Sequence, residues 1–343
     1  MRGGRRERAV FGVVLAIVLG VGAGAPAGAQ RALLTAIARP MGAAEAGASD
    51  ASDAVEESGG SSAEEEASER DPFASSLAGG RLMRGFARHR VLHFTFDDGP
   101  RPDTTPRLLA HLDEHGVKAT FFVVARGFDG RHRMDRRRAA ILRDIAARGH
   151  TIGAHTFDHS RLTALEDDAV RAQLTRSEAA FEAVLGGRPV LFRAPYGARD
   201  ARVDALVAER GYTQVLWNTT AGDVRARSAE EVLEAWRASL DRRERHPRGP
   251  GGVVLLHDTK PWVVNAFPAM MKELRTRNCA LLEQEGEELW DVLDDLSVFH
   301  QARGADVSAR ARTVELDAEW VARRQARLRR EARAYCASSV PAG

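Results

Sequence analysis

The stretch 91–100, with the sequence VLHFTFDDGP, decides how the chain folds. Five of its first six residues are apolar or β-branched, and this pattern predicts a β-strand over residues 91–96. Two carboxylates follow directly at Asp97 and Asp98, and the Gly-Pro pair after them favours a turn. We therefore expect a strand that ends in a polar loop.

Short apolar stretches and longer amphipathic stretches alternate from this point onward. The expected strands are 91–96, 119–124, 151–156, 190–193, 214–218 and 252–257, with a further candidate at 280–282. The expected helices are 105–115, 136–148, 167–185, 201–210, 229–242 and 263–277. Such alternation predicts an α/β fold, with helices outside a parallel sheet that is either closed into a barrel or open and doubly wound.

The chain before residue 86 has two parts. Four arginines within the first eight residues precede an apolar stretch at 9–21 and the small residues of 27–29, a pattern that predicts a signal peptide over residues 1–29. The apolar stretch is shorter than the roughly 20 residues of a spanning helix, and an uncleaved anchor stays the alternative. Residues 30–85 are expected to form a flexible acidic linker, since much of this stretch is Ala, Gly, Ser and Glu. We expect export to the periplasm, the cell envelope or the medium, with membrane contact only through an uncleaved signal.

The net charge of +2 averages two opposite segments. Residues 41–71 hold ten acidic residues and one Arg, whereas 323–333 hold six Arg and one Glu. We expect no nucleic-acid partner, because the basic character is confined to a predicted Arg-rich helical tail at 301–343. The alternatives for that tail are a solvated helix face or contact with acidic envelope polymers. Cys279 and Cys336 could pair in an exported protein, and the sequence leaves this open.

Polar clusters follow five of the predicted strands. They are Asp97-Asp98, His155 with His159, Arg193 to Gly197, Trp217 with Asp223, and His257-Asp258. Active sites of α/β barrels and sheets form at the carboxyl ends of strands. We therefore expect these clusters to meet in one site.

The first two clusters suggest a metal site. Adjacent carboxylates after an apolar strand are costly unless a positive group lies between them, although a simple turn is the alternative for Asp97 and Asp98. His155 and His159 are four residues apart, and two imidazoles with one carboxylate form a common open site for zinc or a related ion. Alone, such a histidine pair more often lies on the surface without a ligand. Because Asp98 follows another strand and could supply a third ligand, we favour the metal site.

The later clusters suggest acid–base chemistry. Arg193 could hold a carboxylate in its ionised form, with a surface ion pair as the alternative. A backbone N–H near Tyr196 could face a developing oxyanion. His257 closes an apolar strand and could act as a general acid if Asp223 orients it; the alternative is a satisfied core histidine.

Taken in order, these motifs resemble a known family. The set Thr95-Phe96-Asp97-Asp98-Gly99-Pro100, His155-Thr156-x-x-His159, Arg193-x-Pro195-Tyr196-Gly197, Asp223 and Leu256-His257-Asp258 is similar to the polysaccharide deacetylases, the NodB-homology domain of carbohydrate esterase family 4. The resemblance spans roughly residues 88–300, and we place the domain at 86–300. It implies a distorted (β/α) barrel of about seven parallel strands and a divalent metal ion: zinc, or cobalt, manganese or nickel.

The resemblance also implies a role for each matching residue. Asp98, His155 and His159 would bind the metal ion. Asp97 would be the catalytic base, and Arg193 would orient it. The remaining implied roles are the oxyanion-hole N–H for Tyr196, the catalytic acid for His257, the tuning of that acid for Asp223, and a substrate-binding wall made by Pro195, Tyr196, Trp217, Val224 and Leu255.

One position departs from the family pattern. The family usually has Trp after the Asp of its fourth motif, where this chain has Val224. With Val at this position, the wall of the pocket for the acetyl methyl group is smaller and less aromatic.

The expected activity is metal-dependent removal of N- or O-acetyl groups from a polysaccharide such as peptidoglycan, a chitin-like oligomer, xylan or an exopolysaccharide. The alternatives are a small-molecule amide hydrolase on the same barrel and a non-catalytic glycan-binding module. The oligomeric state stays open.

Overall fold

The computed structural model describes residues 71–80, 82–128, 133–300 and 313–339. The predicted signal peptide at 1–29 and the linker up to residue 70 lie outside these ranges. Within them, no helix has the length and apolar character that crossing a membrane requires.

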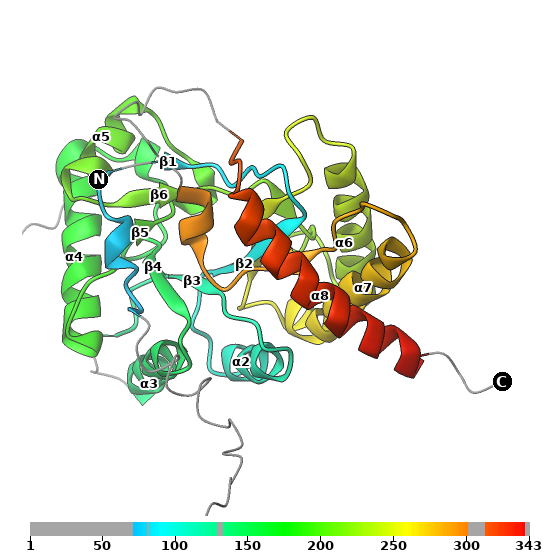
Figure 1. Ribbon diagram of the computed structural model, residues 1–343. Helices are drawn as coiled ribbons and strands as arrows, with labels where there is room; N and C mark the ends of the chain where they lie inside the picture. The colour runs from blue at the N-terminus through cyan, green and yellow to red at the C-terminus, as the bar shows by residue number, and fades with distance from the viewer. Residues whose placement is uncertain (1–70, 81, 129–132, 301–312, 340–343) are drawn as a thin grey trace, which may run out of the picture. The chain divides into compact units, whose positions relative to one another are not determined.

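A parallel sheet forms the centre of the described chain (Figure 1). Its path runs β1-β6-β5-β4-β3-β2-β8-β7, and β9 pairs with β2. All pairings between these strands are parallel. The strands are β1 (Leu82–Met83), β2 (Val91–Asp97), β3 (Thr120–Val123), β4 (Thr151–Ala154), β5 (Leu191–Phe192), β6 (Thr213–Val215), β7 (Thr219–Thr220), β8 (Gly252–His257) and β9 (Asp291–Val292).

The sheet curls because β6 and β7 follow each other in the chain but lie near opposite ends of the strand order. Between them, the N–H of Leu216 donates to Met83 of β1, and the N–H of Asn218 donates to Val253 of β8. A three-residue segment thus connects the two sides of the sheet. The predicted strand 214–218 therefore holds only the end of β6, its residues 216–218 form the connection, and β7 lies just beyond it. The predicted distorted barrel is confirmed.

The helices surround the strands, as Figure 1 shows. They are α2 (Thr105–Glu114), α3 (Arg133–Ala147), α4 (Asp167–Leu185), α5 (Ala201–Glu209), α6 (Ala229–Glu244), α7 (Pro261–Leu282) and α8 (Ala318–Ser339). The main core lies between sheet and helices, where the Phe94 ring of β2 packs on Trp236 of α6 and Phe267 of α7. Burial of these large apolar side chains supplies most of the force that holds the helices on the sheet.

The strand expected at 280–282 is wrong, because these residues form the last turn of α7. Three residues are too few to separate a strand from the end of a helix by periodicity. The last strand is instead β9, which pairs with the start of β2.

The predicted linker 30–85 extends too far toward the domain. The backbone of β1 pairs with β6, and the side chains of Leu77 and Met83 are buried. A two-residue strand gives no periodic signal, so the Ser- and Gly-rich composition around it concealed that the chain at residues 71–80 and 82–83 packs on the sheet.

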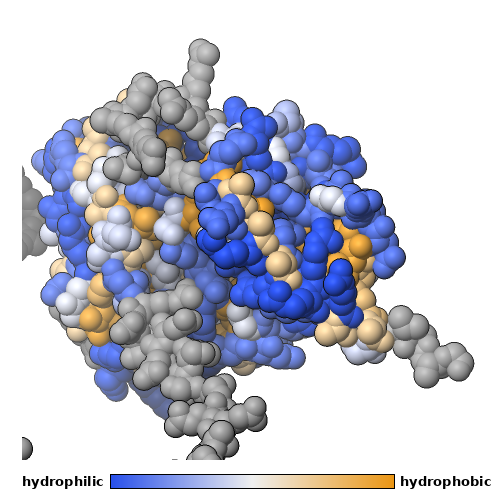
Figure 2. All heavy atoms as spheres, viewed as in Figure 1, coloured by the Kyte–Doolittle hydropathy of each residue, from blue (hydrophilic) through white to orange (hydrophobic). Residues whose placement is uncertain are grey.

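Helix α8, within the predicted Arg-rich tail, is attached to the domain at several points. A disulfide joins Cys279 of α7 to Cys336 of α8, and Arg324 forms an ion pair with the buried Asp291 of β9. The Gln325 side chain exchanges two hydrogen bonds with the backbone of Leu289. The outer surface over α8 is mostly hydrophilic (Figure 2).

Candidate active site

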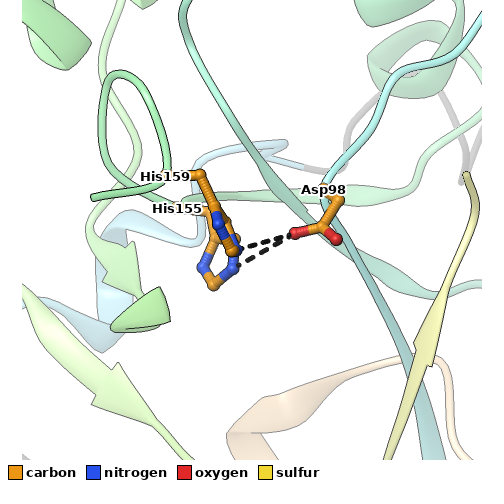
Figure 3. Close-up of side chains that lie close together, drawn as sticks. All are labelled: Asp98, His155 and His159. Carbon is orange, nitrogen blue, oxygen red and sulfur yellow. Dashed lines mark ion pairs between the residues drawn. The ribbon is translucent and has the colours of Figure 1, made fainter. Parts of the chain in front are cut away.

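Asp98, His155 and His159 meet at the carboxyl ends of β2 and β4 (Figure 3). The Oδ1 atom of Asp98 lies 3.1 Å from Nε2 of His159 and 3.5 Å from Nε2 of His155. One possible ligand atom from each residue lies within 4.8 Å of the others. The Oδ1 atom is buried and faces these two imidazole nitrogens. A buried anionic oxygen between two imidazole nitrogens is suited to a divalent cation.

The outer nitrogen of each imidazole is held by a second residue. Nδ1 of His155 donates to the backbone carbonyl of Arg193 at 2.7 Å, so Nε2 presents its lone pair to Asp98. Nδ1 of His159 lies 3.2 Å from the hydroxyl of Tyr196. Partners of this kind fix the tautomer and the ring orientation of metal-binding histidines.

Three residues of the site have left-handed backbone conformations. The φ angles are 77° for Asp98, 67° for His159 and 62° for Tyr196. Such values are uncommon for residues other than glycine and concentrate at functional sites. In the turn of Tyr196, Gly197 also has a positive φ, and a Cβ there would lie 2.9 Å from the Trp217 ring.

Asp97 and Arg193 form an ion pair inside the barrel. Nη1 of Arg193 lies 2.7 Å from Oδ1 of Asp97 and 2.8 Å from the hydroxyl of Thr95. Arg193 is fully buried, its Nε donates to the carbonyl of Val215, and its guanidinium lies 4.0 Å from the centre of the Phe122 ring. A buried guanidinium with this many fixed partners holds the carboxylate of Asp97 in one orientation.

His257 and Asp223 form the second charged pair. Oδ2 of the fully buried Asp223 accepts from both the backbone N–H and Nδ1 of His257, each at 2.8 Å. The indole N–H of Trp262 donates to the carbonyl of Asp223, also at 2.8 Å. Nε2 of His257 lies 4.0 Å from Oδ2 of Asp98, so the ring faces the same space as the metal-site residues.

The electrostatic environment differs among these groups. Burial acts to raise the pKa of Asp98, but the hydrogen bond with His159 and the nearby imidazoles outweigh it and hold this pKa below its ordinary value. Burial lowers the pKa of His155, which favours the neutral form that binds metals. Burial also acts to lower the pKa of His257, but the hydrogen bond and charge of Asp223 outweigh it and raise this pKa above its ordinary value.

These residues surround a cavity of about 250 Å³. Most of the predicted substrate-binding residues line it: Tyr196, Trp217, Val224 and Leu255. The predicted Pro195 is buried and does not belong to the wall, because the turn presents Tyr196 and Gly197 instead. Val224 is 67% exposed, so the position where the family usually has Trp is an open edge of the cavity.

Two residues of this region had no role predicted from the sequence. Lys260 lines the cavity three residues after His257, and a single lysine in a loop carries no motif that would have revealed it. Asp258 is fully buried and accepts a hydrogen bond from Thr105, and burial raises the pKa of Asp258 to about 7. A Cβ at Gly99 would overlap the Asp258 carboxylate, which explains why glycine follows Asp98.

Comparison with known proteins agrees with this geometry. The sequence model of the polysaccharide deacetylase family matches residues 85–215. The chain is also 33% identical over 183 residues to a chitooligosaccharide deacetylase of Azorhizobium caulinodans, covering 53% of this chain and 80% of that protein. The chain belongs to the polysaccharide deacetylase family. Its members are hydrolases that remove acetyl groups, and the predicted family is confirmed.

Further members share the region of the site. A peptidoglycan-N-acetylglucosamine deacetylase of Bacillus cereus is 29% identical, over 53% of this chain and 62% of that protein. The crystal structure of a peptidoglycan N-acetylglucosamine deacetylase has a TM-score of 0.50 and 26% identity, covering 60% of this chain and 92% of the other. The chitin deacetylase of Colletotrichum lindemuthianum also has a TM-score of 0.50, with 25% identity over 57% and 85% of the two chains. Asp223 and His257 lie beyond the part that the family model matches, so their place in the site comes from the tertiary structure.

Proposed function

We propose that this polysaccharide deacetylase uses a divalent metal ion, zinc by preference, to hydrolyse N- or O-acetyl groups on a polysaccharide. The observation that carries the proposal is the convergence of Asp98, His155 and His159 beside two separately paired acid–base groups in one cavity. When bound, such an ion supplies Lewis acidity toward water and toward a carbonyl oxygen. Cobalt, manganese and nickel tolerate similar ligands.

The donor set fits the ion. Two imidazoles with fixed outer nitrogens and one carboxylate provide three ligands, the number typical of catalytic zinc sites. Asp98 stays ionised in the neutral range because its pKa lies below the ordinary value. These three residues would hold the ion.

The other residues then handle protons and charge. Asp97, held by Arg193, accepts a proton from the attacking water. The N–H groups of Gly197 and Ala198 are bonded within the turn, and we assign the contact with the developing oxyanion to the N–H of Tyr196. His257 donates its proton to the leaving amine or alkoxide, and Asp223 keeps the imidazolium stable until that step.

The test is acetate release by the purified chain from acetylated chitooligosaccharides and from peptidoglycan. The assay is run after chelation and again after zinc or cobalt is added back. Release that disappears with chelation and returns with metal supports the proposal, and the better substrate indicates the polymer class.

Three other results would contradict parts of this proposal. Firm metal binding with release only from small acetylated amides would favour a small-molecule hydrolase. Firm binding of glycans without any acetate release would favour a glycan-binding module. Absence of metal binding would overturn the assignment of Asp98, His155 and His159.

We also propose that the protein is exported. The support is the arginine-rich start, the apolar stretch 9–21 and the disulfide between Cys279 and Cys336, a bond that forms mainly in oxidising compartments. N-terminal sequencing of the protein from cells and from medium tests this. A mature start near residue 30 is expected, whereas an intact N-terminus in the cytoplasmic fraction would contradict export.

A further inference from the structure

Lys260 is a cation of the cavity wall that has no carboxylate partner among the described residues. Its side chain lines the cavity just after the end of β8. Its Nζ lies 5.7 Å from the centre of the Trp262 ring. A lysine beside an active site without a carboxylate of its own is available to an anion that enters from outside.

Arg161, in the loop that follows β4, supplies a second cation beside Tyr196. Its guanidinium lies 4.6 Å from the centre of the Tyr196 ring, which lines the cavity, and Arg161 itself is exposed. Tyr196 follows β5 and Lys260 follows β8, whereas the metal-site residues follow β2 and β4, which lie between them in the sheet order. Through its contact with Tyr196, Arg161 therefore lies toward the β5 side of the proposed metal site, and Lys260 lies toward the β8 side.

The acidic groups in and beside the cavity already have partners. Asp97 pairs with Arg193, Asp223 pairs with His257, and Asp98 lies between two imidazoles where it would bind the proposed metal ion. These carboxylates therefore do not neutralise the positive charges of Lys260 and Arg161, which lie beside the cavity that a glycan must enter.

From this arrangement we propose that the natural substrate is an anionic acetylated glycan, with a carboxylate on a sugar next to the acetylated one. The proposal rests on the deacetylase function above and deepens it. Lys260 and Arg161 are specificity-determining residues that contact the carboxylate. A uronic acid provides that carboxylate, as does a lactyl ether that carries no peptide on its carboxyl group, and the substrates below separate the two sources.

The test compares kcat/KM for a neutral acetylated chitooligosaccharide, for a glycan fragment of peptidoglycan and for an acetylated uronate oligosaccharide. At low salt we expect the intact chain to prefer one of the carboxylated substrates, and Lys260→Gln to reduce that preference about fivefold, the upper range for an exposed pair. The change should be carried by KM. Salt at about 1 M, where the Debye length is about 3 Å, should reduce the preference similarly.

Two matched variants control for general effects of charge. Lys272→Gln removes an exposed lysine of α7, the helix that begins after Lys260, and Arg176→Gln removes an arginine that stacks on Phe157, a ring outside the cavity wall. We expect neither to change the preference, whereas Arg161→Gln should reduce it as Lys260→Gln does. Equal preference for neutral and carboxylated substrates in the intact chain, or equal effects of Lys260→Gln and Lys272→Gln, would overturn the inference.

A binding measurement separates this inference from the proposed function. Calorimetry with the Asp97→Asn chain measures the affinity for the carboxylated and neutral fragments without turnover. Acetate release from the neutral oligomer together with equal affinities would leave the deacetylase function standing and remove the charge selectivity. Tighter binding of the carboxylated fragment that depends on Lys260, without acetate release from any substrate, would support the selectivity and overturn the catalytic proposal.

Discussion

Asp97 and His257 are register partners across the ladder between β2 and β8. The proposed base and the proposed acid therefore stand side by side on neighbouring parallel strands, and each is held by an oppositely charged group from elsewhere in the chain: Arg193 for Asp97 and Asp223 for His257. Because the strands fix the backbone at both positions, the spacing of the two proton-transfer groups is a property of the sheet itself.

The adjacent carboxylates should separate into different roles on substitution. Asp97→Asn is expected to lower kcat by about 10²- to 10⁴-fold, the usual contribution of a general base, while zinc still binds. Asp98→Asn is expected to weaken zinc binding by about 100-fold or more, because it removes a proposed ligand. Calorimetric zinc titration and acetate release measure the two effects.

The same experiment needs a check on folding. Asp97→Asn leaves the buried Arg193 with less compensation, so its thermal unfolding is measured alongside. If both variants remain folded and lose zinc equally, the division of roles between Asp97 and Asp98 is wrong.

Asp223→Asn should move the pH profile of the enzyme. The pKa of His257 is raised in the folded protein, so the imidazolium needed for proton donation is present at low pH and is lost as the pH rises through that pKa. Removal of the Asp223 charge lowers the pKa, and the basic limb of kcat at saturating zinc should shift to lower pH. A profile that keeps its basic limb while kcat falls would assign Asp223 a purely structural role.

Two buried histidines away from the cavity should make the fold sensitive to acid. Burial lowers the pKa of His93 to about 4 and that of His150 to about 3. As the pH falls below about 6.5, the unfolded chain takes up protons that the folded chain does not, so the free energy of unfolding decreases down to about pH 4. Each histidine contributes on the order of 1.4 kcal/mol per pH unit in that window.

Denaturant unfolding at a series of pH values tests this prediction. His150→Asn should make the free energy of unfolding fall less steeply with decreasing pH, and His111→Gln on the outer part of α2 is the matched control. Identical slopes for all three proteins between pH 6 and 4 would contradict it.

The disulfide between Cys279 and Cys336 should contribute to stability through the unfolded chain. The cysteines are 57 residues apart, and in the chain-entropy model a bridge over such a loop stabilises the fold by about 4 kcal/mol. The double variant Cys279→Ser/Cys336→Ser is expected to unfold at lower guanidinium concentration, with kcat/KM little changed because no residue of α7 or α8 lines the cavity. A disulfide-intact protein no more stable than the variant would contradict this.

Much of the fold was predictable because the local signals were strong. The helix 167–185 has its acidic first turn and ends before a glycine with φ of 71°, and its predicted bounds equal those of α4. Strand β2 is apolar enough to be found at once. Sequence analysis missed the short strands β1, β7 and β9 and misassigned the end of α7. Segments of two or three residues are too short to show a hydrophobic periodicity.

The residues of the site could be predicted from their types and motifs, but their hydrogen-bond partners could not. His155 and His159 were recognisable from their spacing and from the motif around them. The hydrogen bonds from His155 to Arg193 and between His159 and Tyr196 join residues that are 38 and 37 positions apart, and no local pattern encodes them. Lys260 and the buried Asp258 were given no role for the same reason, since their environments come from packing.

The sequence by itself determined the family, the α/β alternation and the polar residues that follow five of the predicted strands, because these depend on residue order and local periodicity. Only the tertiary structure decided that Arg193 is buried against Asp97, that Pro195 is excluded from the cavity, that the chain around β1 belongs to the sheet and that Cys279 meets Cys336. The physical reason is that a parallel sheet gathers residues at the ends of its strands irrespective of their distance in the chain, while burial and charge compensation then select which of them pair.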